Sequence, residues 1–154
     1  MPLSSTLVAW LFFTTAGAAD PATKPPKPTT VTVAGKVVGL ADALRRRGIE
    51  ADPGPIEGQV AVEAVGGEIV PIVSDEASRA LFLDKRLRDR RAEVVGRRFA
   101  GVPYLQVVTF RVEEEGKLRT PEYYCEICTI SVRYPQICPC CQGEMVLRMR
   151  PEGR

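Results

Sequence analysis

Histidine is absent from this 154-residue sequence. Without an imidazole, the chain cannot form a Ser-His-Asp triad, a Cys-His nucleophile or a histidine metal site. The Cys-x2-Cys-His motif that attaches haem is excluded as well. No other catalytic constellation is recognisable in the sequence, so we predict a protein that is not an enzyme.

A strong charge of either sign is also missing. Lys and Arg number 21 and Asp and Glu number 19, which leaves a net charge of +2. Such a weak overall field gives little attraction for duplex DNA or an anionic membrane, so nucleic acid is a disfavoured partner. Hydrophobic residues make up 45% of the chain, which is enough for one ordinary core and a small additional module.

The first nineteen residues contain no charged side chain and resemble an export signal. They include the apolar run Leu7–Phe13, and they end in small residues that would suit cleavage after Ala18 or Ala19. The run is too short to span a bilayer, because a transmembrane helix needs about 20 apolar residues. We therefore predict a signal peptide at residues 1–19 and a protein of the periplasm or the exterior. An uncleaved anchor or an unstructured start are the alternatives.

The rest of the chain divides by composition into three parts. Residues 20–30 are rich in proline and predict an extended linker. Residues 31–115 hold most of the valine and leucine and predict the main domain. Residues 116–150 contain all five cysteines and predict a separate small module that resembles a zinc ribbon.

The main domain reads as strands with little helix. Alternating apolar and polar residues predict strands in 31–39, 59–65, 68–73, 92–99 and 104–112. A short helix is expected at 40–47, and a second one is expected to begin after Ser74 as N-cap and to reach Leu87. The fold class is therefore mainly β (α+β). Five short strands with a helix between the third and fourth favour an OB-like five-stranded barrel, and a roll-like or SH3-like barrel is the alternative.

The cysteines form the motif with the most definite chemistry. Two Cys-x2-Cys pairs stand nine residues apart, and two such turns can present four thiolates at tetrahedral positions. Zinc takes this arrangement in closed structural sites, and iron takes it in rubredoxin-like sites, so zinc is predicted and iron is the alternative. The predicted metal ligands are Cys125, Cys128, Cys138 and Cys141.

Other uses of the cysteines stay open. Export favours disulfides, because oxidising compartments preserve them, but a disulfide framework usually spreads its cysteines along the chain. A redox-active dithiol would need a helix after its motif, whereas the β-favouring run 129–132 follows Cys128. Cys140 is the surplus thiol and is expected to point away from the metal. Gly143 is expected to supply the positive φ of the second turn.

A run of basic residues offers a second candidate site. Acidic residues are interspersed in it, and mixed runs of this kind usually form a solvated, ion-paired surface, which is the interpretation favoured here over a groove for single-stranded nucleic acid. The run comprises Lys85, Arg86, Arg88, Arg90, Arg91, Arg97 and Arg98, with Asp84, Asp89 and Glu93 among them.

Two stretches, 78–88 and 123–143, carry a resemblance. Their residues Ser78-Arg79-Ala-Leu-Phe82-Leu-Asp84 and Tyr123-Tyr124-Cys125, with the two cysteine pairs, are similar to a group of exported bacterial proteins in which an OB-like barrel precedes a short cysteine ribbon. The resemblance spans 31–149 and implies no activity. The ribbon departs from ordinary zinc ribbons because it lacks glycine directly after Cys128 and Cys141.

Three hypotheses for function follow. The favoured one is an exported, non-enzymatic binding or structural protein whose partner is a protein or another polymer of the cell envelope. The second is a thiol-redox or metal-handling protein of the envelope. The third is a single-stranded nucleic-acid-binding OB protein, which would require the export signal to be misread.

Overall fold

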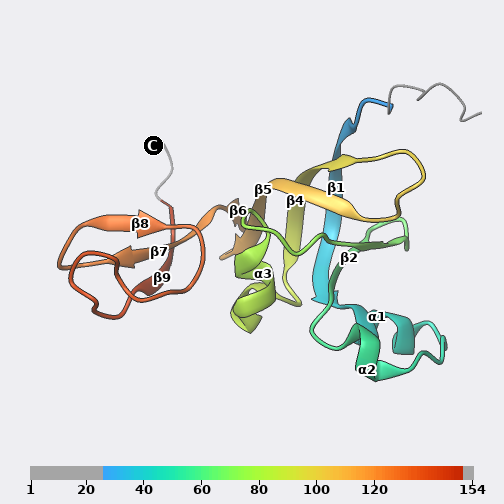
Figure 1. Ribbon diagram of the computed structural model, residues 1–154, viewed down its shortest axis with the longest axis horizontal. Helices are drawn as coiled ribbons and strands as arrows, with labels where there is room; N and C mark the ends of the chain where they lie inside the picture. The colour runs from blue at the N-terminus through green and yellow to red at the C-terminus, as the bar shows by residue number, and fades with distance from the viewer. Residues whose placement is uncertain (1–25, 151–154) are drawn as a thin grey trace, which may run out of the picture.

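The structure is a computed structural model, and it describes residues 26–150 as a mainly β fold with two antiparallel sheets and few helices (Figure 1). This agrees with the predicted fold class at the level of a β-rich α+β protein. The predicted signal peptide at 1–19 and residues 20–25 of the predicted linker lie outside the described residues.

The larger sheet has six strands in the order β3-β2-β1-β4-β5-β6. β1 runs through its middle and is the longest strand, because its alternating β-branched residues place one face in the core. The strands are β1 Thr29–Gly39, β2 Val60–Ala64, β3 Ile69–Pro71, β4 Arg91–Arg98, β5 Leu105–Glu114 and β6 Lys117–Arg119.

Helices occupy two connections of this sheet. Between β1 and β2 lie α1 (Leu40–Arg46) and the single turn α2 (Pro53–Ile56). Between β3 and β4 lie α3 (Arg79–Leu83) and one turn of 3-10 helix, η1 (Lys85–Leu87). Among the described residues, no helix has the length and apolar character needed to cross a membrane.

The second predicted helix begins later than expected and is interrupted. Ser74 is not its N-cap, because Asp75 and Ser78 first form a turn in which Ser78 N donates to Asp75 Oδ1 at 3.1 Å and Ser78 Oγ accepts from Asp75 N at 3.0 Å. Such local side-chain bonds compete with a helix. α3 then ends at Asp84, whose carboxylate accepts a hydrogen bond from Arg86 N and starts η1.

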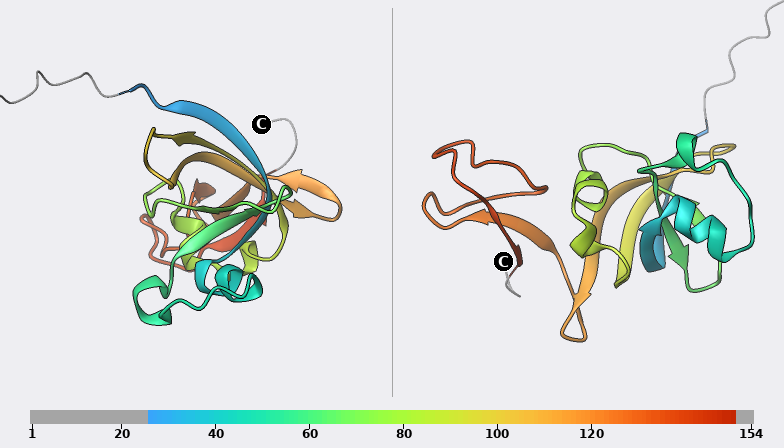
Figure 2. Two further views of the ribbon diagram at one scale, coloured as in Figure 1. Left: turned by 90° about the vertical axis from the view of Figure 1, so that its right-hand side faces the viewer. Right: turned by 90° about the horizontal axis from the view of Figure 1, so that it is seen from below.

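One parallel bridge joins the two sides of the large sheet. Ile72, directly after β3, pairs with Leu105 at the start of β5, and Val73 N donates to Leu105 O at 3.0 Å. The sheet curls so that these segments meet, as the end-on view of Figure 2 shows. Within the described residues this single bridge does not close the sheet into a barrel, so the predicted OB-like barrel stays unconfirmed.

The core of the large sheet consists of aliphatic side chains from every long strand. Val37, Val60, Val94, Leu105 and Val112 are fully buried there. Leu81 of α3 and Leu87 of η1 are fully buried in the same cluster, so the second helical segment covers one side of the core. Burial of this kind is the main source of stability for such a domain.

The smaller sheet has three strands in the order β8-β7-β9 and lies beside α3 (Figure 1). Its strands are β7 Pro121–Cys125, β8 Ile130–Val132 and β9 Val146–Met149. We call residues 121–149 the ribbon. Met145 is buried and Leu147 and Met149 pack on the core, whereas Val146 is exposed, so alternate residues of this segment face the core.

Members of the basic run form ion pairs, in agreement with the predicted ion-paired surface. Arg98 pairs with Glu68 at 3.0 Å, and Arg111 pairs with Glu93. Arg88 has a role that the charge pattern did not predict. Its guanidinium donates to the carbonyls of Leu81 and Phe82, where α3 ends, and thereby satisfies helix carbonyls that lack partners.

Candidate metal centre

The four predicted ligands lie together at the end of the ribbon. Their sulfur atoms are all within 4.8 Å of one another, and Cys125 Sγ and Cys141 Sγ are 3.5 Å apart. Four thiolates at 2.3 Å from a tetrahedral zinc would be separated by roughly 3.8 Å. The spacing of the cysteines is therefore compatible with a structural metal site. The residues of the group are Cys125, Cys128, Cys138 and Cys141.

The two cysteine turns have the same backbone geometry. In the first, Thr129 N donates to Cys125 O at 2.8 Å, and in the second, Gln142 N donates to Cys138 O at 2.9 Å. In each turn the donor is the residue directly after the second cysteine, and its φ is positive, at 56° for Thr129 and 59° for Gln142. Two segments of different sequence thus present their cysteines in matching ways.

The assignment of positive φ to Gly143 is wrong. The left-handed residue of the second turn is Gln142, and Gly143 has another task, because its carbonyl accepts a hydrogen bond from Cys138 N at 2.9 Å. A Cβ at this glycine would lie 3.4 Å from Cys141 Sγ, so a side chain here would be in contact with that sulfur.

Backbone amides also act directly on the sulfur atoms. Cys128 N donates to Cys125 Sγ at 3.4 Å. The amides of Cys141 and, less strongly, Cys140 lower the pKa of the Cys138 thiol to about 6, although burial opposes them. The thiols of Cys140 and Cys141 raise the pKa of Cys128. Cys138 therefore ionises before Cys128, and a metal that binds here would have to displace protons.

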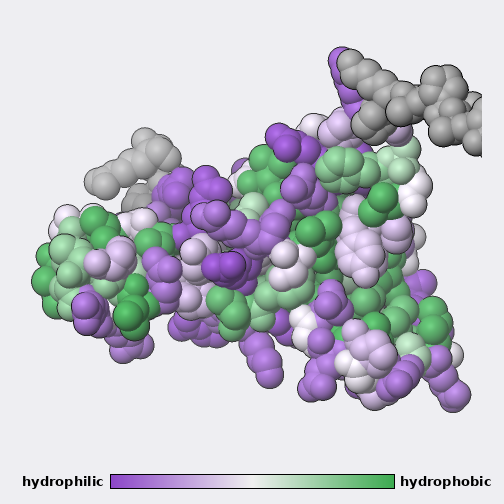
Figure 3. All heavy atoms as spheres, viewed as in Figure 1, coloured by the Kyte–Doolittle hydropathy of each residue, from purple (hydrophilic) through white to green (hydrophobic). Residues whose placement is uncertain are grey.

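The cysteines differ in exposure within each turn. The first of each pair, Cys125 and Cys138, is buried, whereas Cys141 is exposed. Cys140 is also exposed and is not part of the group of four, as expected for the surplus thiol. Two isoleucines near the turns, Ile127 and Ile137, are exposed as well, and Figure 3 shows hydrophobic residues gathered on this lobe.

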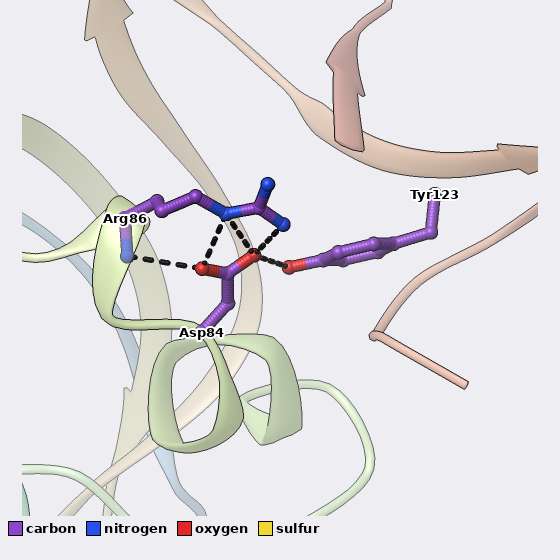
Figure 4. Close-up of polar contacts among 3 residues, drawn as sticks. All are labelled: Asp84, Arg86 and Tyr123. Carbon is purple, nitrogen blue, oxygen red and sulfur yellow. Dashed lines mark hydrogen bonds and ion pairs between the residues drawn. The ribbon is translucent and has the colours of Figure 1, made fainter. Parts of the chain in front are cut away.

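A buried polar network joins the ribbon to the larger sheet. Tyr123 of β7 is fully buried, and its hydroxyl donates to Asp84 Oδ2 at 2.7 Å (Figure 4). The Arg86 guanidinium donates to the same carboxylate, with Nη2 2.7 Å from Oδ2. Arg86 first and Tyr123 next lower the pKa of Asp84 to about 2 against the effect of burial. Burial and this carboxylate raise the pKa of Tyr123.

Further contacts support the ribbon. The buried Glu122 accepts from Arg148 Nε at 2.8 Å and from Arg150 Nε at 3.3 Å, which ties β7 to β9. The Arg79 guanidinium of α3 lies 4.8 Å from the centre of the Tyr134 ring. This cation–π contact is a second link between the ribbon and the body of the protein.

Sequence reasoning missed the network around Asp84. It assigned Asp84 to a solvated charge run and gave Tyr123 no structural role, although the two residues meet in the core. They stand 39 residues apart, and no periodicity connects them. One usable signal exists in the Asp84-x-Arg86 spacing, which lets a carboxylate cap the next turn and pair with the arginine.

Comparison with known proteins gives no family for this chain. The resemblance to exported bacterial proteins therefore stays a prediction, and what remains firm is the group of four neighbouring cysteines. No protein-family model, no curated protein and no solved structure matches the sequence or the fold.

Proposed function

We propose that this is an exported, non-enzymatic binding or structural protein whose ribbon is held by a structural zinc ion. The observation that carries the proposal is the convergence of four thiols within 4.8 Å from two turns of matching geometry. A site with four protein ligands leaves no open position for a substrate, which favours a structural role over catalysis. The proposed ligands are Cys125, Cys128, Cys138 and Cys141.

Zinc is the metal proposed for this site, and iron is the alternative. Both metals accept four thiolates in a tetrahedral arrangement, so the donor set alone does not separate them. The surroundings do offer the amide hydrogen bonds that stabilise charged sulfur, as at Cys125 and Cys138. When bound, the metal would neutralise the thiolates and cross-link the two turns.

The larger sheet supports an OB-like barrel as the scaffold. Its first five strands follow the order β3-β2-β1-β4-β5, and α3 lies in the chain between the third and fourth of them. The parallel bridge between Ile72 and Leu105 brings the β3 side of the sheet to β5. Closure between the third and fifth strands is what a five-stranded Greek-key barrel requires.

Export and the partner class rest on the sequence. The uncharged leader with its small-residue end supports export to the periplasm or the exterior. A barrel domain at 31–115 with a zinc-ribbon-like module at 116–150 would then serve to dock a protein or another polymer of the envelope. Within this proposal the ribbon is a rigid appendage, because Tyr123 and Tyr134 attach it to α3 and the segment after it.

The test is metal analysis and thiol counting on residues 20–154, with native and denaturing mass spectrometry. We expect one zinc ion per chain and no disulfide. Cys138→Ser should lose the metal, because it removes a buried ligand. Cys140→Ser is the matched control and should keep the metal, because it removes the exposed thiol outside the group of four.

Two results would favour one of the other two functional hypotheses. A metal-free chain whose mass is lower by a pair of hydrogens for each disulfide would refute the zinc site and favour a disulfide or thiol-redox protein. Salt-dependent binding to single-stranded nucleic acid, together with a cytoplasmic location, would favour the third hypothesis.

A further inference from the structure

One half of β1 is paired on a single side. Its residues 29–36 pair with β4, but its pairing with β2 covers only 35–39. The last contact on the β2 side is Val65 N, which donates to Ala34 O at 3.0 Å. Within the described residues, Thr29–Val33 therefore form an open sheet edge, and Figure 2 shows this half of β1, in blue, along the rim of the sheet.

The geometry of β1 identifies the groups that point to this edge. Ala34 O faces β2, and alternate residues of a strand direct their N–H and C=O groups to the same side. Thr30 and Thr32 therefore direct theirs to the open edge, whereas Val31 and Val33 direct theirs to β4. The edge thus offers two regularly spaced donor and acceptor pairs.

Thr29–Val33 itself carries none of the side chains that usually protect such edges, although Lys27 and Pro28 directly precede it. Natural edges carry charges, prolines or bulges that prevent pairing with another chain. Thr29–Val33 consists of five β-branched residues with no charge and no proline. A groove of about 530 Å³ runs beside it, lined by β1, by the tip of the β2–β3 hairpin and by Arg98. Val65, at that tip, is 86% exposed.

The chain's own N-terminal segment does not suit this edge. Residues 20–28, which precede the strand, contain four prolines, and proline has no N–H to donate to a ladder. An identical strand suits it better, because Thr29–Val33 has no charged side chain that its copy would repel, and the nearby Arg98 is already paired with Glu68. We propose that the occupant is a second copy of this chain, and that two β1 strands pair antiparallel across a two-fold axis.

The register of this pairing follows from the side chains. With Val31 on the axis, Thr30 lies opposite Thr32 of the second copy, and each such pair exchanges two backbone hydrogen bonds. On the inner side Val31 faces its copy and Val33 faces Thr29, and on the outer side threonine faces threonine, which are favourable cross-strand pairs. The ladder ends at Pro28, which lies opposite Ala34 of the second copy. Proline has no N–H to donate, and the Ala34 carbonyl already accepts a hydrogen bond from Val65 N. The interface is isologous, as in most homodimers.

The test measures mass and amide exchange in residues 20–154 loaded with zinc. Light scattering should give twice the mass of one chain, and the amides of Thr30 and Thr32 should gain protection as the protein concentration rises. Thr32→Pro should halve the mass, because it removes an N–H from the open edge and leaves the bonds to β4 intact. Thr32→Lys should do the same, because it places like charges near each other.

Thr109→Lys is the matched control, because it adds the same charge at an exposed residue of β5 and should leave the dimer unchanged. Thermal unfolding by circular dichroism verifies that each variant is folded. A chain of single mass whose Thr30 and Thr32 amides exchange freely at all concentrations would overturn the proposal. So would a dimer that survives both substitutions of Thr32. Neither result bears on the metal content, so this inference and the proposed zinc site fail separately.

Discussion

The larger sheet buries a continuous set of valine and leucine side chains, whereas the ribbon buries little beyond Tyr123, Met145 and two cysteines. β1 alone has 11 residues, while the ribbon strands β8 and β9 have 3 and 4. A sheet as small as that of the ribbon buries too little apolar surface to offset the conformational entropy that its chain loses on folding. The larger sheet can therefore fold on its core, and the ribbon depends on cross-links.

Those cross-links are of two kinds. One is the cysteine group, which would close the two turns around a metal. The other is the polar network in which Tyr123 reaches Asp84 across the boundary of the two sheets. Each can be removed separately, so the comparison can be tested one link at a time.

Removal of the metal should have the largest effect. Structural zinc supplies roughly 10–16 kcal/mol of apparent binding free energy in small zinc modules. We expect a strong chelator to abolish the amide-exchange protection of β7, β8 and β9, while β1, β4 and β5 keep theirs. Hydrogen exchange with mass spectrometry, before and after chelation, measures this. Equal protection of the ribbon in both states would show that it does not need a metal.

A cavity in the core should affect the opposite region. Leu81 of α3 is fully buried, and Leu81→Ala should lower the free energy of unfolding by about 2–5 kcal/mol, as large-to-small core substitutions do. Leu83→Ala in the same helix is the control, because Leu83 is 57% exposed and its removal should change little. Urea unfolding followed by circular dichroism compares them. Equal losses would contradict the placement of α3 on the core.

The same contrast explains what could be predicted from the sequence. The strands of the larger sheet were predictable because alternation at period two records which residues face the core, as in 31–39. The cysteine group was predictable because ligand spacing is local. The interruption of the second helix at Asp84 and the contact with Tyr123 were not, because they depend on which carboxylate is buried, and that is decided by packing between distant segments.

The polar network should contribute a smaller, pH-dependent share. Asp84 has its pKa lowered from 3.8 to about 2 in the folded state, so the unfolded chain binds more protons in that range. Its contribution, about 2 kcal/mol, is fully present above about pH 5 and is lost as the pH falls through the folded-state pKa of about 2. Asp84→Asn should remove it. We expect the difference in unfolding free energy between this variant and the unsubstituted chain to disappear at the acid end.

Two tyrosine substitutions distinguish the contribution of this hydrogen-bond network from that of side-chain packing. Tyr123→Phe should cost about 1–3 kcal/mol, because it leaves the buried Asp84 carboxylate with one partner fewer. Tyr124→Phe is the control, because Tyr124 is only half-buried and meets Arg148 through its ring, 3.3 Å from the guanidinium carbon. Unfolding of the zinc-loaded chain at neutral pH compares the two. An equal cost for both would contradict a special role for the Tyr123 hydroxyl.

The smallest effect is expected where the ribbon's own backbone is strained. Thr129 has φ 56°, a conformation that costs a β-branched residue about 1–2 kcal/mol and glycine almost nothing. Thr129→Gly should recover part of that, less about 0.5–1 kcal/mol for the added freedom of the unfolded chain. The net gain, about 0.5–1 kcal/mol, should appear as zinc binding roughly 2–5 times tighter in competition with a chromophoric chelator.

The control for this gain is a glycine where the backbone is extended. Ser131 of β8 is exposed, and Ser131→Gly carries the same entropic cost with no strain to relieve, so zinc should bind more weakly. Gln142→Gly tests the matching turn and should strengthen binding as Thr129→Gly does, because Gln142 has φ 59°. If both glycines at positive φ weakened binding, the two turns would not be held in this conformation by the metal.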